Sequence, residues 1–231
     1  MSKFLGHIAC PRCGSKDNLG EYEDHWFCFG CKYTKRKDDV QSLRKRLNKG
    51  NATAKEVEML DNFAEIPRKA MQWLLSYGIS QEEIDEYGIK WNPTQQLLVL
   101  IEGLKYWQGR SFSEHTKQKY MSQGKKPDTI YGMGDTLVLV EDVLSAIKIA
   151  RLRDEYCAMP VLGSTLSFES EQSLSKQFKT IYVWLDRDKA LNALRIKRRL
   201  HQKGITSRII VTELDPKVYS KEQLKEYLDS N

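Results

Sequence analysis

Two pairs of closely spaced cysteines constrain the fold of this chain more than any other feature of its sequence. Cys10 and Cys13 form one Cys-x-x-Cys pair, Cys28 and Cys31 form a second, and fourteen residues separate the two pairs. Each pair places two thiolates on one tight turn, and two such turns complete the tetrahedral site that is typical of structural Zn²⁺. Disulfide bonding is the alternative, but its geometry suits a Cys-x-x-Cys turn poorly. We therefore predict a Zn²⁺ site formed by all four cysteines.

The segment around the cysteine pairs predicts an all-β zinc ribbon over residues 1–35. Residues 19–22 and 25–27 have the pattern of two short strands joined by an acidic turn. The ribbon is rich in aromatic side chains for its size, which favours stacking on the bases of a single-stranded nucleic acid. His25 and Trp26 are the candidate residues for such contacts. The alternative is that the aromatic side chains simply form the core of this small domain.

Residues 36–62 are charged and polar with few apolar side chains, which predicts a flexible linker. The whole chain has 37 Lys and Arg residues against 31 Asp and Glu residues, a formal net charge of +6. This basic excess is compatible with a nucleic-acid partner. No apolar stretch approaches the roughly 20 residues that span a bilayer, so we expect no membrane partner.

Residues 63–132 predict an α+β lobe. A helix is expected over residues 67–78, and Ser80 with Glu83 has the spacing of a capping box that begins a second helix. The two apolar runs within residues 96–112 predict a hairpin. The lobe is therefore expected to combine two helices with antiparallel strands.

A basic cluster follows the predicted hairpin. Arg110, Lys117 and Lys119 lie in a segment that is nearly free of acidic residues, with Tyr120 among them. Such a cluster could bind phosphate groups of a nucleotide or of a nucleic-acid backbone. The alternative is an ordinary solvated loop.

Residues 133–231 alternate between strand and helix patterns, which predicts an α/β domain with a mainly parallel sheet. Strands are expected over residues 136–140, 158–162, 180–185 and 207–214, and helices over residues 143–153, 167–178, 189–203 and 220–228. The third strand is a continuous run of β-branched and aromatic residues, as in strands buried on both faces.

Acidic residues follow three of these strands. Glu141 comes after the first, Asp186 and Asp188 after the third, and Asp215 after the fourth. Parallel strands bring their carboxyl ends to one edge of the sheet, where ligands bind. Residues i and i+2 point the same way in extended chain, so Asp186 and Asp188 are expected to face one cation together. Hard oxygen ligands suit Mg²⁺. A turn made soluble by its acids is the alternative for Asp186 and Asp188 alone.

These motifs together resemble those of a bacterial or phage DNA primase, with a zinc ribbon and a TOPRIM catalytic domain. The resemblance is greatest to the primase half of phage primase-helicases. It rests on Glu141, the Asp186-Arg187-Asp188 motif, Asp215, the ribbon run 25–28 and the basic segment 108–132. The resemblance implies four parts, which are a ribbon over 1–35, a linker over 36–62, a lobe of the RNA polymerase domain over 63–132 and a TOPRIM domain over 133–231.

The resemblance also implies a function. A chain of this kind makes short RNA primers on single-stranded DNA from ribonucleoside triphosphates, using structural Zn²⁺ and catalytic Mg²⁺ or Mn²⁺. It implies that Glu141, Asp186, Asp188 and Asp215 hold the catalytic metal. Arg110, Lys117 and Lys119, together with His25 and Trp26, would bind nucleotide or template. It implies location in the cytoplasm, that of the host if the chain is phage-encoded.

The sequence departs from the primase pattern after its first acid and after the Asp186-Arg187-Asp188 motif, where family members often have a glycine and this chain has Leu191 or Asn192. Where the family has a glycine after the first acid, this chain has Asp142, and the positions of later acids hold Val143 and Ser145. No Walker A motif is present, so the replicative helicase is expected on a separate chain or in a region that this sequence lacks. Two alternatives stay open, which are a TOPRIM nuclease and a non-catalytic adaptor that binds single-stranded DNA.

Overall fold

The computed structural model describes residues 2–37, 57–152, 155–163 and 165–230. The chain divides into two compact units, Met1–Glu56 and Val57–Asn231, which are treated separately below. Most of the predicted linker lies outside the described residues. No helix among the described residues is long and apolar enough to cross a lipid bilayer.

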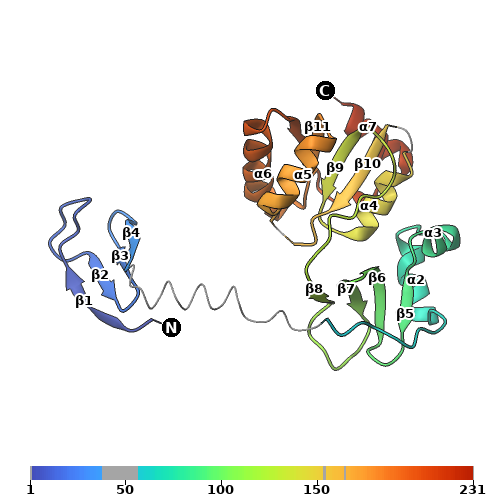
Figure 1. Cartoon of the computed structure of the whole chain (residues 1–231), viewed down its shortest axis with the longest axis horizontal. Helices are drawn as coiled ribbons and strands as arrows, with labels where there is room; N and C mark the ends of the chain where they lie inside the picture. Colours follow the sequence, from blue (N-terminus) through green and yellow to red (C-terminus); the bar gives the residue numbers. More distant parts are fainter. Residues whose placement is uncertain (1, 38–56, 153–154, 164, 231) are drawn as a thin grey trace. The chain divides into compact units, whose positions relative to one another are not determined.

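The first unit contains one antiparallel sheet in the order β1-β2-β3-β4 (Figure 1). Its strands are β1 (Phe4–Ile8), β2 (Leu19–Tyr22), β3 (His25–Cys28) and β4 (Thr34–Arg36). The two central strands are those that the sequence predicts. The two outer strands were not predicted, because their side chains are largely exposed and show no alternation between apolar and polar residues. The core of this unit is small and consists mainly of Cys10, Leu19 and Cys28.

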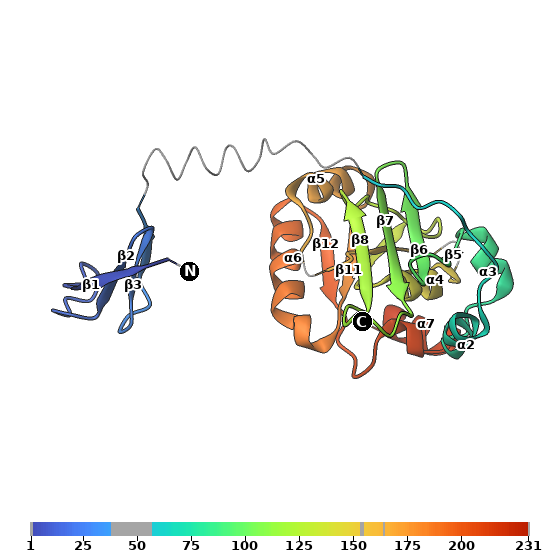
Figure 2. The same cartoon turned by 90° about the horizontal axis from the view of Figure 1, so that it is seen from below.

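The second unit begins with the lobe. Its two helices are α2 (Arg68–Ser76) and α3 (Gln81–Glu86), and the predicted capping box of Ser80 and Glu83 is present at the start of α3. The lobe also has an antiparallel sheet, in which β6, β7 and β8 lie side by side in Figure 2. Its strands are β5 (Lys90–Asn92), β6 (Leu97–Gly103), β7 (Tyr106–Ser111) and β8 (Tyr120–Gly124).

The lobe differs from the sequence prediction around its hairpin. The strands β6 and β7 confirm the hairpin, but β8 extends the sheet into a segment for which a solvated loop was the alternative. Tyr120, from the predicted basic cluster, pairs with Arg110 in the register of β7 and β8. This pairing brings two parts of the cluster together on one sheet.

The C-terminal part of the second unit is a four-stranded sheet in the order β10-β9-β11-β12, and every strand pair in it is parallel. The strands are β9 (Thr136–Val140), β10 (Tyr156–Pro160), β11 (Thr180–Trp184) and β12 (Thr206–Ile209). The helices are α4 (Val143–Ala150), α5 (Phe168–Gln177), α6 (Ala190–Gln202) and α7 (Lys221–Asp229). The predicted fold class, an antiparallel ribbon followed by α+β and parallel α/β parts, is confirmed.

Helices cover both faces of the parallel sheet (Figure 1). Leu137 and Leu139 of β9 pack in one core with α5 and α6, whereas Val138 and Val140 pack in another with α4 and α7. Burial on both faces explains why the strand sequences are continuously apolar. The second of these cores continues into the lobe, where it includes Leu74 and Leu98. The lobe and the parallel sheet therefore share one hydrophobic core.

Two predicted strands are displaced in the structure. The strand expected over 158–162 is β10 (Tyr156–Pro160), and the strand expected over 207–214 stops at Ile209. The N–H of Ile210 still donates to the C=O of Val183 (3.0 Å), after which the chain leaves the sheet, and Thr212 and Leu214 take part in local hydrogen bonds instead of strand pairing. Asp215 therefore does not sit at the tip of a strand.

Candidate metal sites and nucleic-acid interface

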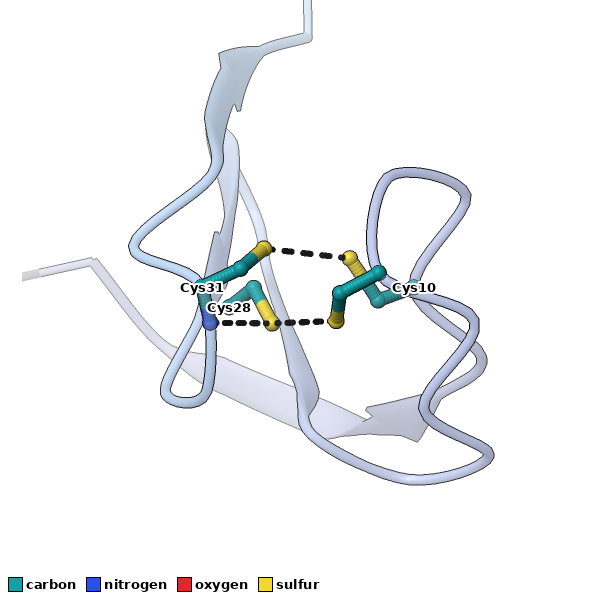
Figure 3. Close-up of side chains that lie close together, drawn as sticks. Cys10, Cys28 and Cys31 are labelled. Carbon is teal, nitrogen blue, oxygen red and sulfur yellow. Dashed lines mark hydrogen bonds between the residues drawn. The ribbon is translucent and has the colours of Figure 1, made fainter.

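The side chains of Cys10, Cys28 and Cys31 point toward one another in Figure 3, and the Sγ atom of Cys13 lies in the same cluster, with all four sulfurs within 4.8 Å of one another. The Sγ atoms of Cys10 and Cys31 are 3.8 Å apart, and so are those of Cys13 and Cys28. A tetrahedron with Zn–S bonds of about 2.3 Å has edges of about 3.8 Å, so the spacing fits Zn²⁺. Among the described residues, this is the only group of three or more His, Cys, Asp or Glu residues whose ligand atoms all lie within 4.8 Å.

The charges of these thiols also favour a cation. Burial raises the pKa of the Cys10 thiol, but hydrogen bonds from the backbone N–H groups of Cys13 and Arg12 outweigh this and lower the pKa to about 6. The pKa of Cys31 is instead raised to about 11, since burial and the neighbouring sulfurs outweigh the hydrogen bond from Tyr33. The Cys10 thiolate therefore forms easily, and its negative charge disfavours ionisation of the neighbouring thiols. A bound Zn²⁺ would offset this repulsion and allow all four thiols to ionise.

The acidic edge of the parallel sheet begins with Glu141, directly after β9. Its backbone C=O accepts a hydrogen bond from the N–H of Leu162 (3.0 Å), and its Oε2 atom is buried without a hydrogen-bond partner among the described residues. Burial raises the pKa of Glu141, and Asp188 adds to this while Lys189 acts against it. A buried carboxylate oxygen without a donor is costly. A bound cation would supply the missing partner.

Asp186 follows β11 and lies beside two of the other predicted acids. Burial, together with Glu141 and Asp215, raises the pKa of Asp186 to about 7, although Lys217 acts against this. The structure thus brings Glu141, Asp186 and Asp215 to one edge. They are not as tightly grouped as the four cysteines. Carboxylates that disfavour each other's ionisation fit a site for Mg²⁺, which takes oxygen ligands and retains water.

The expectation that Asp186 and Asp188 share a strand face is wrong. Asp188 lies in a short 3-10 helix, η1 (Arg187–Lys189), so the alternation of side chains in extended chain does not apply to it. Its side chain is 72% exposed and pairs with Lys189 Nζ at 3.0 Å. Asp188 still lies near enough to influence Glu141, but from the solvent side of the edge.

Asp215 reaches the acidic edge through an irregular segment held by the core. The indole Nε1 of the fully buried Trp184 donates to Thr212 Oγ1 (2.8 Å), and this hydroxyl donates to the C=O of Leu214 (2.8 Å). The N–H of Leu214 donates to the hydroxyl of Tyr219 (3.2 Å). The sequence pattern predicts the acid but not this route, which depends on a tryptophan 31 residues earlier in the chain.

Lys217 is the residue at this edge that the sequence reasoning missed. Its Nζ lies 2.8 Å from Asp142 Oδ2 and 2.6 Å from Asp215 Oδ2, and its side chain is 14% exposed. Asp142 is also the N-cap of α4, where its side chain accepts hydrogen bonds from the N–H and the hydroxyl of Ser145. The only feature of the sequence that could have indicated this role is that Lys217 follows a predicted metal ligand, Asp215, by two residues.

A pocket of about 260 Å³ opens at this edge between the lobe and the parallel sheet. Its lining includes Glu141 and Asp142 from the sheet and Gln108 and Tyr120 from the lobe. The acids thus share a cavity with strands β7 and β8. This pocket is where a substrate would meet both parts of the second unit.

Arg110 lies among aromatic rings of the lobe. Its Cζ is 4.5 Å from the ring centroid of Trp73 and 5.7 Å from those of Phe112 and Tyr120, and its Nε is buried without a hydrogen-bond partner. These cation–π contacts fix the guanidinium beside the pocket-lining Tyr120. Lys117 and Lys119 are exposed in the segment between β7 and β8, and neither has an ion pair within the described residues.

The two predicted base-contacting residues of the ribbon lie on β3. The ring of His25 stacks on Tyr22 with centroids 4.5 Å apart, and its Nδ1 is 2.6 Å from Asp24 Oδ1. Trp26 packs against the cysteine core, and Lys37 Nζ lies 4.9 Å from the centre of its ring. Trp26 therefore contributes to the fold of the ribbon.

Two solved structures resemble this chain in fold. The zinc-binding and RNA polymerase domains of the Aquifex aeolicus primase match with a TM-score of 0.52 and 15% identity, over 99% of this chain and 80% of that one. The catalytic domain of the DnaG primase bound to single-stranded DNA matches with a TM-score of 0.54 and 17% identity, over 82% and 78%. The chain has a primase fold.

Within this primase fold, the sheet with the cysteine cluster corresponds to a zinc ribbon and the parallel sheet to a TOPRIM-like domain. At the level of sequence, no protein-family model and no curated protein matches the chain. The likeness to the two primase structures therefore lies in the arrangement of helices and strands. This is the fold that the motifs of the sequence predict.

The raised pKa of Asp186 makes stability without Mg²⁺ depend on pH. Between about pH 4 and pH 7 the folded chain keeps a proton that the unfolded chain has released, because the pKa of Asp186 moves from 3.8 to about 7. The free energy of unfolding due to this group therefore falls as the pH rises through this window. We expect the Tm, measured without Mg²⁺, to fall more steeply across this window in the unmodified chain than in Asp186→Asn.

The same measurement at pH 8 separates the effect of Mg²⁺ binding on the Tm from the effect of the proton on Asp186. Added Mg²⁺ should raise the Tm of the unmodified chain, because binding to the folded state alone stabilises it. The Asp186→Asn variant should respond much less. Equal pH slopes and equal responses to Mg²⁺ in the two proteins would show that Asp186 neither has a raised pKa nor binds Mg²⁺.

Proposed function

We propose that this chain is a DNA primase that makes short RNA primers on single-stranded DNA by metal-assisted nucleotidyl transfer. The observation that carries the proposal is the pocket in which the acidic edge at Glu141 and Asp142 faces Gln108 and Tyr120 of the lobe. A polymerase needs such a place, where metal ligands and a nucleic-acid surface share one cavity. The primase fold and the DNA in one of the similar structures support the same conclusion.

The acids supply the reaction centre in this proposal. Glu141, Asp186, Asp188 and Asp215 hold Mg²⁺, or Mn²⁺ in its place, which stabilises charge on the attacking and leaving oxygens of an in-line transfer. Glu141 is also suited to accept the proton of the attacking 3′-hydroxyl. Burial raises its pKa, which makes its carboxylate a better base than an exposed one.

The lobe and the ribbon hold the substrates. Lys117 and Lys119, exposed and without ion pairs in the described part of the chain, bind the triphosphate or the template backbone. Arg110 binds there too and holds Tyr120 in place through its cation–π contact. In the ribbon, His25 contacts template bases, and Trp26 supports it from the zinc-bound core. A replicative helicase is the expected protein partner, and the cytoplasm the expected location.

Incorporation of labelled ribonucleotides on a mixed set of single-stranded DNA templates tests this function. With Mg²⁺ and all four ribonucleoside triphosphates, we expect short RNA products whose synthesis requires a template. Cleavage of labelled DNA without nucleotides would instead indicate a nuclease. DNA binding without any incorporation would indicate an adaptor.

A further inference from the structure

We propose that Lys217 acts as a built-in cation that takes the place of a second metal ion, so that the acidic edge binds a single divalent ion. This inference rests on the proposed metal-assisted function and specifies how many ions its site uses. It starts from the observation that Asp142 and Asp215 form ion pairs with a lysine, whereas Glu141 and Asp186 have no ion pair among the described residues.

The first group already contains a cation. Lys217 Nζ lies between Asp142 Oδ2 at 2.8 Å and Asp215 Oδ2 at 2.6 Å, and the three side chains are 14%, 21% and 32% exposed. An ammonium at these distances occupies the space in which an ion bridging the two oxygens would lie, since Mg²⁺ needs oxygens at about 2.1 Å. Removing a charge from a largely buried pair is costly, so a dissolved ion does not readily displace the lysine.

The backbone holds this lysine in position. Lys217 lies in a short 3-10 helix, η2 (Pro216–Val218), in which Pro216 is buried and the N–H of Val218 donates to the C=O of Asp215 (3.0 Å). The opposite carboxylate, Asp142, is fixed by its two hydrogen bonds from Ser145. The lysine is thus clamped between two elements, η2 and the start of α4, that contact each other.

The second group lacks such a cation. Glu141 Oε2 is buried with no hydrogen-bond partner among the described residues, and Asp186 lies beside it. Lys189 influences Glu141, but it pairs with Asp188 at 3.0 Å, and the two side chains of that pair are 32% and 72% exposed. An exposed pair of this kind contributes little and yields to a metal. The single ion is therefore expected between Glu141 and Asp186. Asp215 then pairs with Lys217 instead of binding the ion, which narrows the set of four acids named in the proposed function.

Titration with Mn²⁺, followed by electron paramagnetic resonance on the full chain with its Zn²⁺ in place, counts the ions directly. We expect one Mn²⁺ per unmodified chain and two per Lys217→Ala chain, because Asp142 and Asp215 become available. Lys217→Gln keeps the length of the side chain without its charge and should also bind two, which covers the case that the alanine variant does not fold. Lys217→Arg should bind one.

The control is Lys225→Ala, which removes an exposed lysine paired with Glu155 in the same unit and should leave the count at one. Two ions on the unmodified chain, or one ion on both Lys217→Ala and Lys217→Gln, would overturn this inference and leave the proposed function standing. In the latter case Lys217 would only anchor η2 to α4. No bound Mn²⁺ on the unmodified chain would overturn the proposed function as well.

Discussion

Primer synthesis is expected to fall about a thousandfold or more when Asp186 is replaced by alanine. Asp186 interacts with both Glu141 and Asp215 at the acidic edge, and its loss removes a ligand of the proposed Mg²⁺ site. A metal that stabilises the transition state contributes several kcal/mol, and each 1.36 kcal/mol changes a rate about tenfold. The measurement is the initial rate of ribonucleotide incorporation on single-stranded DNA at saturating Mg²⁺.

The fold of this variant should survive, which makes the activity loss interpretable. Because burial and like charge raise the pKa of Asp186, its removal relieves a cost at pH 8, and the Tm without Mg²⁺ should stay equal or rise. Asp85→Ala is the matched control, since it removes an exposed acid of α3 whose side chain accepts a hydrogen bond from Gln81. Full activity of Asp186→Ala would remove the acidic edge from the proposed mechanism.

Removal of Zn²⁺ is expected to unfold the ribbon and leave the second unit folded. The ribbon has a core of only three buried residues, whereas a structural Zn²⁺ contributes an apparent 10–16 kcal/mol, roughly the total stability of a whole domain. The second unit contains the shared hydrophobic cores and none of the four clustered cysteines. Amide hydrogen exchange, resolved by peptide, should show lost protection over β2 and β3 and unchanged protection over β9 and β11.

Two cysteine variants test the four-cysteine Zn²⁺ site without removing the metal from solution. Cys28→Ser should reduce the zinc content from one ion per chain to none or nearly none, since Cys28 is a fully buried member of the four-cysteine cluster. Cys157→Ala is the control, because this buried thiol belongs to β10 and should leave the zinc content at one. Retention of Zn²⁺ by Cys28→Ser, with a protected ribbon, would contradict the four-cysteine site.

The parts of the fold that sequence alone could predict are those whose signal is local. Ser80 and Glu83 form the predicted capping box, because both hydrogen bonds join residues three positions apart. The continuous apolar run over 180–184 forms the predicted buried strand, because burial on both faces leaves no position for a polar side chain. Strands β1 and β8 were missed because they carry mixed and exposed side chains, and only their partners hold them in a sheet.

The residue types at the candidate site followed from the sequence, but their roles depended on tertiary contacts. Asp186 and Asp215 were recognisable as acids after strands, yet the position of Asp215 depends on Trp184 and Thr212. Arg110 was recognisable as a cation, but only the fold surrounds it with three aromatic rings. Asp188 was placed on the wrong face, because η1 interrupts the extended chain on which the i, i+2 rule depends.

The sequence by itself predicted the four-cysteine cluster, the α/β class and the acids Glu141, Asp186 and Asp215 that lie together at one edge, because each depends on residue type and short spacing. Only the tertiary structure decided which acids stand alone and which already have a cation. Lys217 and Asp142 are 75 residues apart in the chain, and no local pattern connects them. They meet because parallel strands bring distant loops to one edge of the sheet, where burial strengthens the attraction between their charges.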